Sequence, residues 1–177
     1  IAGLESNPGF KFSAGLLKRM LMALVYGDVF MRVLYATRPY EQVPGAADEL
    51  YEKWSRVARR NVYTGSFRKF KSCIQEIVKD FDALPLRDIK KPKVGVVGEI
   101  LVKYHPNANN DIVGTIEREG GEAVVLDLID FFLYGMYSKK FNFEHLSGLK
   151  IRCILRISPR KPARLFPWVI SAEKAGC

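Results

Sequence analysis

The segment from Lys93 to Asp130 constrains the fold of this 177-residue chain more than any other feature. A short β-branched run over Val94–Val97 stops at Gly98, and a second apolar run covers Ala123–Leu126. Between them, a polar loop leads into apolar residues at helical spacing, and two glycines then end the helix. A strand, a crossover helix and a second parallel strand form a βαβ unit. The sequence therefore predicts an α/β fold with a Rossmann-like parallel βαβ layer, whose ligand site lies at the carboxyl ends of the strands.

Three amphipathic helices are predicted before this unit. The first follows Ser13, a residue type that commonly caps helices, and ends near Thr37, two residues before a proline. The second covers roughly Ala46–Asn61, and the third follows Ser66 and runs to about Phe81. Each carries an apolar stripe with a spacing of three and four residues, which must be buried against a neighbour.

The chain divides into three predicted parts. Residues 1–92 form a helical segment that packs on the sheet, residues 93–157 form the Rossmann-like βαβ portion, and residues 158–177 form an irregular basic tail rich in proline. Within the middle part, a short helix is predicted to leave the second strand near residues 128–135, and another helix is predicted over Asn142–Leu155.

The formal net charge of +9 is concentrated at the C-terminus, because residues 150–177 hold seven basic residues and one acidic residue. This segment is either a solvated end, an end separated from its natural partner, or a nucleic-acid contact through Lys150–Arg164. No recognition helix or aromatic-rich strand accompanies the charges, so a nucleic-acid partner is not expected.

Cysteine spacing and apolar run length exclude two further classes of protein. The three cysteines show no spacing of a zinc or iron–sulfur site, so no metal site is predicted, and Cys73 is expected in the core. No uninterrupted apolar run reaches the roughly 18 residues of a membrane span, so we expect a cytoplasmic chain with no membrane partner.

Several phrases of the chain resemble one family. Four segments are similar to the large CoA-substrate-specific enzyme activases of anaerobic bacteria: VGVVGEILVKYHPNANNDIV, VVLDLIDFFLYGMY, PGFKFS and YGDVFMRVLYATRPYE. These are relatives of the activators of 2-hydroxyacyl-CoA dehydratases and benzoyl-CoA reductases. The resemblance covers about residues 7–140, and the segment after about Ile157 does not resemble the family.

The resemblance implies that this chain is a fragment of the later, dehydratase-like part of a multi-domain protein. Its expected role is that of a substrate-facing or interaction domain in ATP- and iron–sulfur-dependent electron transfer on CoA-thioester enzymes. ATP and a [4Fe–4S] cluster are implied for the parent protein; this chain has no phosphate loop and no cluster-type cysteine set, so none is expected here. The implied partners are other domains of the parent chain, an acyl-CoA dehydratase or reductase component, and a CoA thioester.

Polar residues follow the predicted strand ends. Gly98 allows a tight turn or close approach to a ligand, and Glu99, Asp127 and Asp130 converge if the strands are neighbours. Clustered carboxylates serve as acid or base or hold a metal; the alternative is that Asp127 and Asp130 simply cap helices. With His105 as a titratable loop residue, Glu99 and Asp127 suggest an alternative function. The chain would then be a small independent enzyme acting by acid–base chemistry on a nucleotide-like or CoA substrate.

The remaining candidate ligand residues are amides and one guanidinium. Asn107, Asn109 and Asn110 crowd the loop before the crossover helix, and Asn109 or Asn110 is predicted to cap that helix at Asp111. A helix start also attracts anions such as a CoA phosphate, although Asp111 competes for the same position. Arg38 pairs either with one of the acids, with a ligand phosphate, or with another helix as a structural tie.

Overall fold

The computed structural model describes residues 13–135, all within the first of the chain's two compact units, Ile1–Gly135. Over these residues the fold is mixed α/β and mostly helical, with a small parallel sheet. The helix predicted over Asn142–Leu155 and the basic tail predicted over 158–177 lie outside the described residues.

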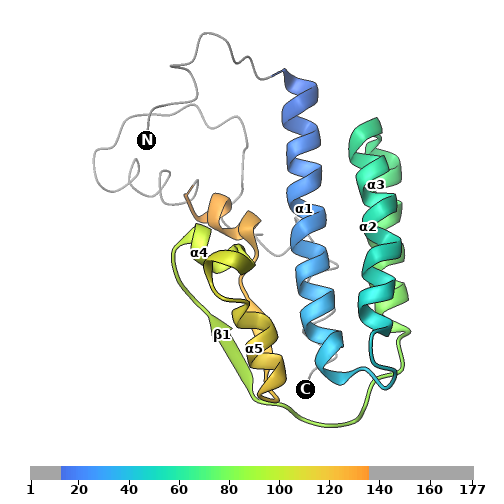
Figure 1. Cartoon of the computed structure of the whole chain (residues 1–177). Helices are drawn as coiled ribbons and strands as arrows, with labels where there is room; N and C mark the ends of the chain where they lie inside the picture. Colours follow the sequence, from blue (N-terminus) through green and yellow to red (C-terminus); the bar gives the residue numbers. More distant parts are fainter. Residues whose placement is uncertain (1–12, 136–177) are drawn as a thin grey trace, which may run out of the picture. The chain divides into compact units, whose positions relative to one another are not determined.

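Three long helices run side by side (Figure 1): α1 (Ala14–Thr37), α2 (Ala46–Thr64) and α3 (Phe67–Asp82). The predicted bounds of α1 are confirmed, and Ser13 Oγ accepts a hydrogen bond from the Leu16 amide at 3.1 Å as the N-cap. α2 continues three residues past its predicted end at Asn61. It stops at Gly65, whose φ of 67° is a left-handed conformation that favours glycine.

The helices share one aromatic and aliphatic core. Phe81 and Ile77 of α3 are completely buried, and Trp54 of α2 is nearly so. The Tyr26 ring of α1 packs edge-on against Phe70 with centroids 4.9 Å apart. The core also contains further buried side chains: Met22, Val29, Phe30, Leu34, Ala47, Ala58 and Ile74. Cys73, expected in the core, is half-buried at its edge.

Within residues 13–135, one side-chain hydrogen bond between the helices is fully buried, and it lies in this core. Tyr26 donates its hydroxyl hydrogen to Asn61 Oδ1 at 2.9 Å, and the Asn61 amide donates to the Ser66 carbonyl at 3.2 Å. A hydroxyl buried without a partner would cost free energy of folding, so this chain of bonds fixes how α1 meets the turn between α2 and α3.

The two strands, β1 (Lys93–Val96) and β2 (Glu122–Val125), pair in parallel, with Lys93 opposite Glu122 and Val96 opposite Val125. The predicted parallel βαβ unit is therefore confirmed. The sheet has two strands in the described part of the chain, so these residues do not amount to a full Rossmann-like layer.

The crossover between the strands contains more helix than predicted. Besides the expected α5 (Ile112–Arg118), it holds a short α4 (Ile100–Tyr104) and a 3-10 turn, η3 (Pro106–Ala108). The two glycines end α5 as predicted. A side chain at Gly121 would meet Ile116 Cγ2 at 2.9 Å and the Pro92 carbonyl at 3.4 Å, so the chain passes closely here into β2.

α1 lies between the α2–α3 pair and the sheet and contacts both (Figure 1). Contrary to the expectation from charge spacing, the stretch Ala14–Tyr40 is long and apolar enough, by length and composition alone, to cross a membrane. This is weak evidence for a membrane span, because the core helix of a soluble protein and a signal sequence near the N-terminus pass the same test; 39% of the window is buried here. The C-terminal half of α1 supplies buried Phe30 and Leu34 to the interior, as a core helix does.

Candidate functional site

The carboxyl end of β1 turns directly into a helix. Gly98 has a φ of 153°, a positive value that glycine adopts readily, and the backbone then enters α4. Glu99 is the N-cap of α4, and its carboxylate accepts hydrogen bonds from the amides of Leu101 at 3.1 Å and Val102 at 3.4 Å. The charge of Glu99 thus already occupies the positive end of this helix.

The loop after α4 is held by one asparagine. Asn109 donates to the Val102 carbonyl at 2.9 Å and accepts from the Ile112 amide at 3.2 Å, so it joins α4 to α5. The predicted cap of α5 is confirmed in part: the Asn109 side chain accepts from the first amide of the helix, but the N-cap position itself is taken by Asp111. Asp111 lies in a left-handed backbone conformation, which short polar residues tolerate. Its Oδ1 accepts a hydrogen bond from the amide of Gly114, three residues later, at 3.4 Å.

The other loop candidates are exposed. His105 follows α4, where its backbone amide donates to the Leu101 carbonyl at 3.1 Å, and both His105 and Asn107 are exposed. Asn110 is also exposed, with a φ of 55°. Among the described residues none of these side chains forms a hydrogen bond with Glu99, whose carboxylate accepts from the amides of α4 instead.

The carboxyl end of β2 meets α1 through buried charges. Asp127 is 8% exposed and accepts from Arg32 at 2.6 Å. Asp28 is equally buried, and its two oxygens accept from the amides of Leu128 at 2.9 Å and Ile129 at 2.8 Å. The sequence suggested that Asp127 or Asp130 caps a helix here. The helical residues 128–135 are instead capped by the Asp28 carboxylate of α1.

The pKa values of these carboxyls reflect their burial. Loss of water raises the pKa of Asp28 and of Asp127 above the ordinary value; the Asp130 carboxylate acts in the same direction and Arg32 in the opposite one. Asp127 and Asp130 thus have Asp28 and Arg32 as charged neighbours, while Glu99, which the sequence pattern grouped with them, caps α4.

We expect the substitution Asp127→Asn to change how stability depends on pH. Because the folded state holds the proton of Asp127 more tightly than the unfolded chain, the stability from this group is present at low pH and is lost as the pH rises through the raised pKa. Asparagine does not titrate, so the variant should gain stability relative to the wild type as the pH rises from about 4, the ordinary aspartate pKa, through the raised pKa of Asp127. Urea midpoints over this range measure the difference, and a difference independent of pH would contradict the expectation.

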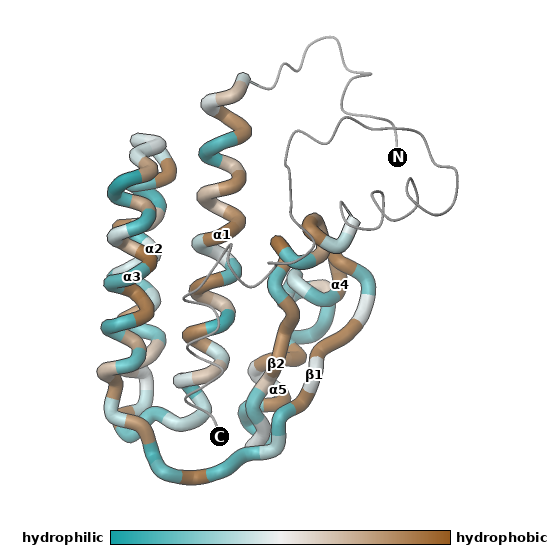
Figure 2. The backbone as a smooth tube through the Cα atoms, turned by 180° about the vertical axis from the view of Figure 1, so that it is seen from behind, coloured by the Kyte–Doolittle hydropathy of each residue, from teal (hydrophilic) through white to brown (hydrophobic). Residues whose placement is uncertain are grey.

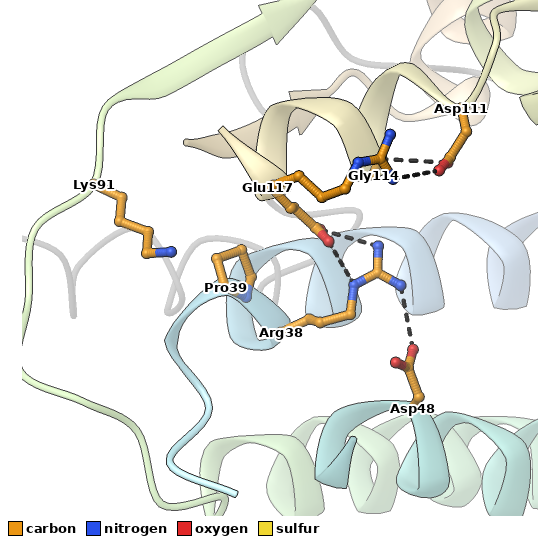
Figure 3. Close-up of a pocket in the computed structure, with 8 residues that line it drawn as sticks. Arg38, Pro39, Asp48, Lys91, Asp111, Gly114 and Glu117 are labelled. Atoms are coloured by element: carbon orange, nitrogen blue, oxygen red, sulfur yellow. Dashed lines mark hydrogen bonds and ion pairs between the residues drawn. The ribbon is translucent and has the colours of Figure 1, made fainter. Parts of the chain in front are cut away.

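A shallow hollow of about 460 Å³ lies around Arg38. The guanidinium donates from Nε and Nη2 to the two Glu117 oxygens at 2.8 and 3.0 Å, and from Nη1 to Asp48 at 3.2 Å (Figure 3). Arg38 is thus the structural tie between helices, joining the 3-10 helix η2 (Arg38–Tyr40) to α5 and α2. The other lining residues are Pro39, Lys91, Asp111, Gly114 and Arg118.

The charges around the hollow are balanced. Arg38 meets two carboxylates and Arg118 meets Asp111 at 3.4 Å, while Figure 3 shows the ammonium of Lys91 reaching into the same space. A phosphate that entered here would compete with Glu117 for Arg38. The hollow is therefore poorly suited to a strongly anionic ligand.

The segment η2 (Arg38–Tyr40) and the residue after it form a structural hub. Tyr40 donates to Glu122 of β2 at 2.7 Å. Glu41 accepts from the amides of Gly45 at 2.7 Å and Ala47 at 3.0 Å, so it caps the start of α2. These polar residues thus hold the helices and the sheet together.

Exposed apolar side chains lie at and after the carboxyl ends of β1 and β2. Val97, directly after β1, is 84% exposed, and Leu126, directly after β2, is 61% exposed. Tyr104 of α4 donates to the Leu126 carbonyl at 2.6 Å, which holds α4 beside the end of β2. Further exposed apolar residues follow in this region: Ile100, Leu101, Val102, Phe131, Phe132 and Tyr134.

Sequence reasoning missed Asp28, Arg32 and this apolar surface. Asp28 and Arg32 interrupt an apolar helix at a spacing of four residues, which places both on one face, and that spacing is the signal in the sequence. Within residues 13–135 no group of three or more His, Cys, Asp or Glu residues is arranged to hold a metal ion.

Comparisons with protein-family models, with curated proteins and with solved structures found no match to this chain.

Proposed function

We propose that this chain is a substrate-facing or interaction domain of an activase or dehydratase-like protein that acts on CoA-thioester enzymes. The observation that supports the proposal is the apolar surface at the carboxyl ends of two parallel strands. In parallel α/β sheets this edge is where ligands bind. The parent protein would complete the sheet into a Rossmann-like layer and would function in the cytoplasm.

The carboxylates near the strand ends support binding rather than catalysis. Glu99 and Asp111 cap short helices, and Asp127 is paired with Arg32, so each already has a folding role. An acid–base enzyme needs such groups within reach of a reacting atom. Exposed apolar side chains instead match the acyl chain and pantetheine arm of a CoA thioester, or the surface of a dehydratase or reductase component.

The cofactors implied for the parent do not fit these residues. A [4Fe–4S] cluster needs four cysteine ligands, whereas the whole sequence has three, and residues 13–135 include only Cys73 among them. No phosphate loop is present for ATP. We propose that ATP and the cluster belong to other domains of the parent, which deliver electrons to the enzyme that this domain contacts.

Titration calorimetry of the full chain with CoA and with an acyl-CoA tests the proposal. We expect saturable binding of the acyl-CoA without turnover. Replacing Leu101 by serine should lower that affinity about tenfold, because a contact of about 1.5 kcal/mol is lost when an apolar side chain is no longer buried. Leu101 is 62% exposed in the free chain, so its replacement leaves the fold intact.

The matched control is Val43→Ser, which makes a similar change at a 59% exposed residue between η2 and α2. It should leave the affinity unchanged. Equal affinities for Leu101→Ser and Val43→Ser would remove the apolar surface as the binding site. Absence of binding to any CoA species would remove the substrate-facing role. Turnover of the thioester by the isolated chain would favour the small independent enzyme.

A further inference from the structure

Charge is divided unequally between the two ends of the helical part. Residues 14–27 of α1 and residues 55–75 of α2 and α3 contain eight basic residues and no aspartate or glutamate. We call this part the basic end. Its eight basic residues, all exposed, are Lys18, Arg19, Arg56, Arg59, Arg60, Arg68, Lys69 and Lys71. The acidic residues of α2 and α3 all lie in the opposite halves of these helices.

The basic end is a single region in space. In Figure 1 the N-terminal half of α1 and the turn between α2 and α3 lie at the same end of the helices. A side chain added at Gly65, in that turn, would lie 3.4 Å from Arg19 Nε of α1. None of the eight cations forms an ion pair with another residue of the described part, so within that part no acidic side chain neutralises their charge.

Large apolar side chains are exposed among these cations. Figure 2 shows hydrophobic and hydrophilic residues alternating along the N-terminal half of α1. Tyr63 and Phe67, on either side of the α2–α3 turn, are 79% and 61% exposed. The others are Leu16, Leu17, Met20, Leu21 and Val57. The aliphatic residues of α1 recur at a spacing of four, so they project from one face of the helix.

We propose that the basic end is a docking surface for a bilayer containing anionic phospholipid. Cations held around apolar side chains are the arrangement of proteins that lie on membranes, where the apolar groups enter the interface and the cations meet the headgroup phosphates. Lysine and arginine reach those phosphates while their stems lie along apolar surface. α1 need not cross the bilayer, because its C-terminal half is buried against the other helices and β2.

The exposed leucines and methionine favour lipid over nucleic acid. A nucleic acid offers phosphates for the cations and base faces for Tyr63 and Phe67, but it gives aliphatic side chains no apolar environment. The surface is also separate from the CoA surface proposed above, which lies at the strand ends, so either assignment can fail without the other.

Flotation of the full chain with vesicles tests the docking surface. The chain should bind vesicles of equal parts phosphatidylcholine and phosphatidylglycerol and should not bind vesicles of phosphatidylcholine alone. The triple substitution Arg59→Gln, Arg60→Gln and Lys69→Gln should weaken binding on the order of a hundredfold, about fivefold for each cation lost. Circular dichroism checks that the exposed substitutions leave the helices intact.

The matched control removes the same charge elsewhere, by Lys79→Gln, Arg87→Gln and Lys90→Gln, all at exposed positions outside the basic end. It should weaken binding far less. A second variant, Leu17→Ser with Leu21→Ser, should weaken binding about tenfold with no change of charge.

Three outcomes would overturn the docking surface. Equal weakening by the two charge-removing triples would assign the attraction to net charge, including that of the basic residues after Lys150. The absence of binding to the anionic vesicles would remove it directly. Binding of a DNA duplex by a chain that ignores these vesicles would assign the basic end to nucleic acid.

Discussion

Replacing Arg38 by alanine is expected to lower the free energy of unfolding by about 3 kcal/mol. The Arg38 and Glu117 side chains are 25% and 14% exposed, and the guanidinium spans both carboxylate oxygens. Removing one partner of a largely buried pair leaves the other charge without compensation, which costs more than the pair contributed. Urea unfolding followed by circular dichroism measures the loss.

Two further variants separate this effect from the general loss of a charge. Arg118→Ala removes a cation from the same hollow, but its pair with Asp111 is 66% and 60% exposed, so we expect a loss below about 1 kcal/mol. The double variant Arg38→Ala with Glu117→Ala should lose much less stability than the sum of the losses in the two single variants. If Arg38→Ala were as mild as Arg118→Ala, Arg38 would not be a structural tie, and a ligand role would regain support.

Replacing Phe81 by alanine is expected to cost about 4 kcal/mol of stability. Phe81 is completely buried near the end of α3, and alanine would leave a cavity that rigid helices fill only in part. A domain of this size has roughly 5–15 kcal/mol of stability in total, so the variant should unfold at a much lower urea concentration.

The matched control lies on the same helix. Phe67 is 61% exposed and stacks on Phe70 with centroids 5.7 Å apart, so Phe67→Ala should cost less than about 1 kcal/mol. Similar losses for the two phenylalanines would mean that α3 does not bury the face that carries Phe81.

Much of the fold could be predicted because it depends on local pattern. The apolar spacing of α1, α2 and α3 and the two short valine-rich strands indicate these elements without knowledge of what they contact. α4 could not be found in this way. It has five residues, and the run around Ile100–Val102 is apolar at every position, so no periodicity distinguishes a helix from an extended strand end.

The candidate site was less predictable because its contacts join distant positions. Arg38 had three possible roles in the sequence, and the choice depended on Glu117, 79 residues later. In the sequence, Asp28 only interrupts an apolar helix. Nothing in its local sequence indicates that its carboxylate accepts hydrogen bonds from the amides of Leu128 and Ile129. The N-cap position of α5 was placed one or two residues early, because the sequence does not show that Asp111 adopts a left-handed backbone conformation.

The cap that Asp28 provides across 100 residues also affects how the protein assembles. The helix beginning at residue 128 completes its first turn only when the earliest helix is already in place. We therefore expect the beginning and end of residues 13–135 to form and melt in one concerted step.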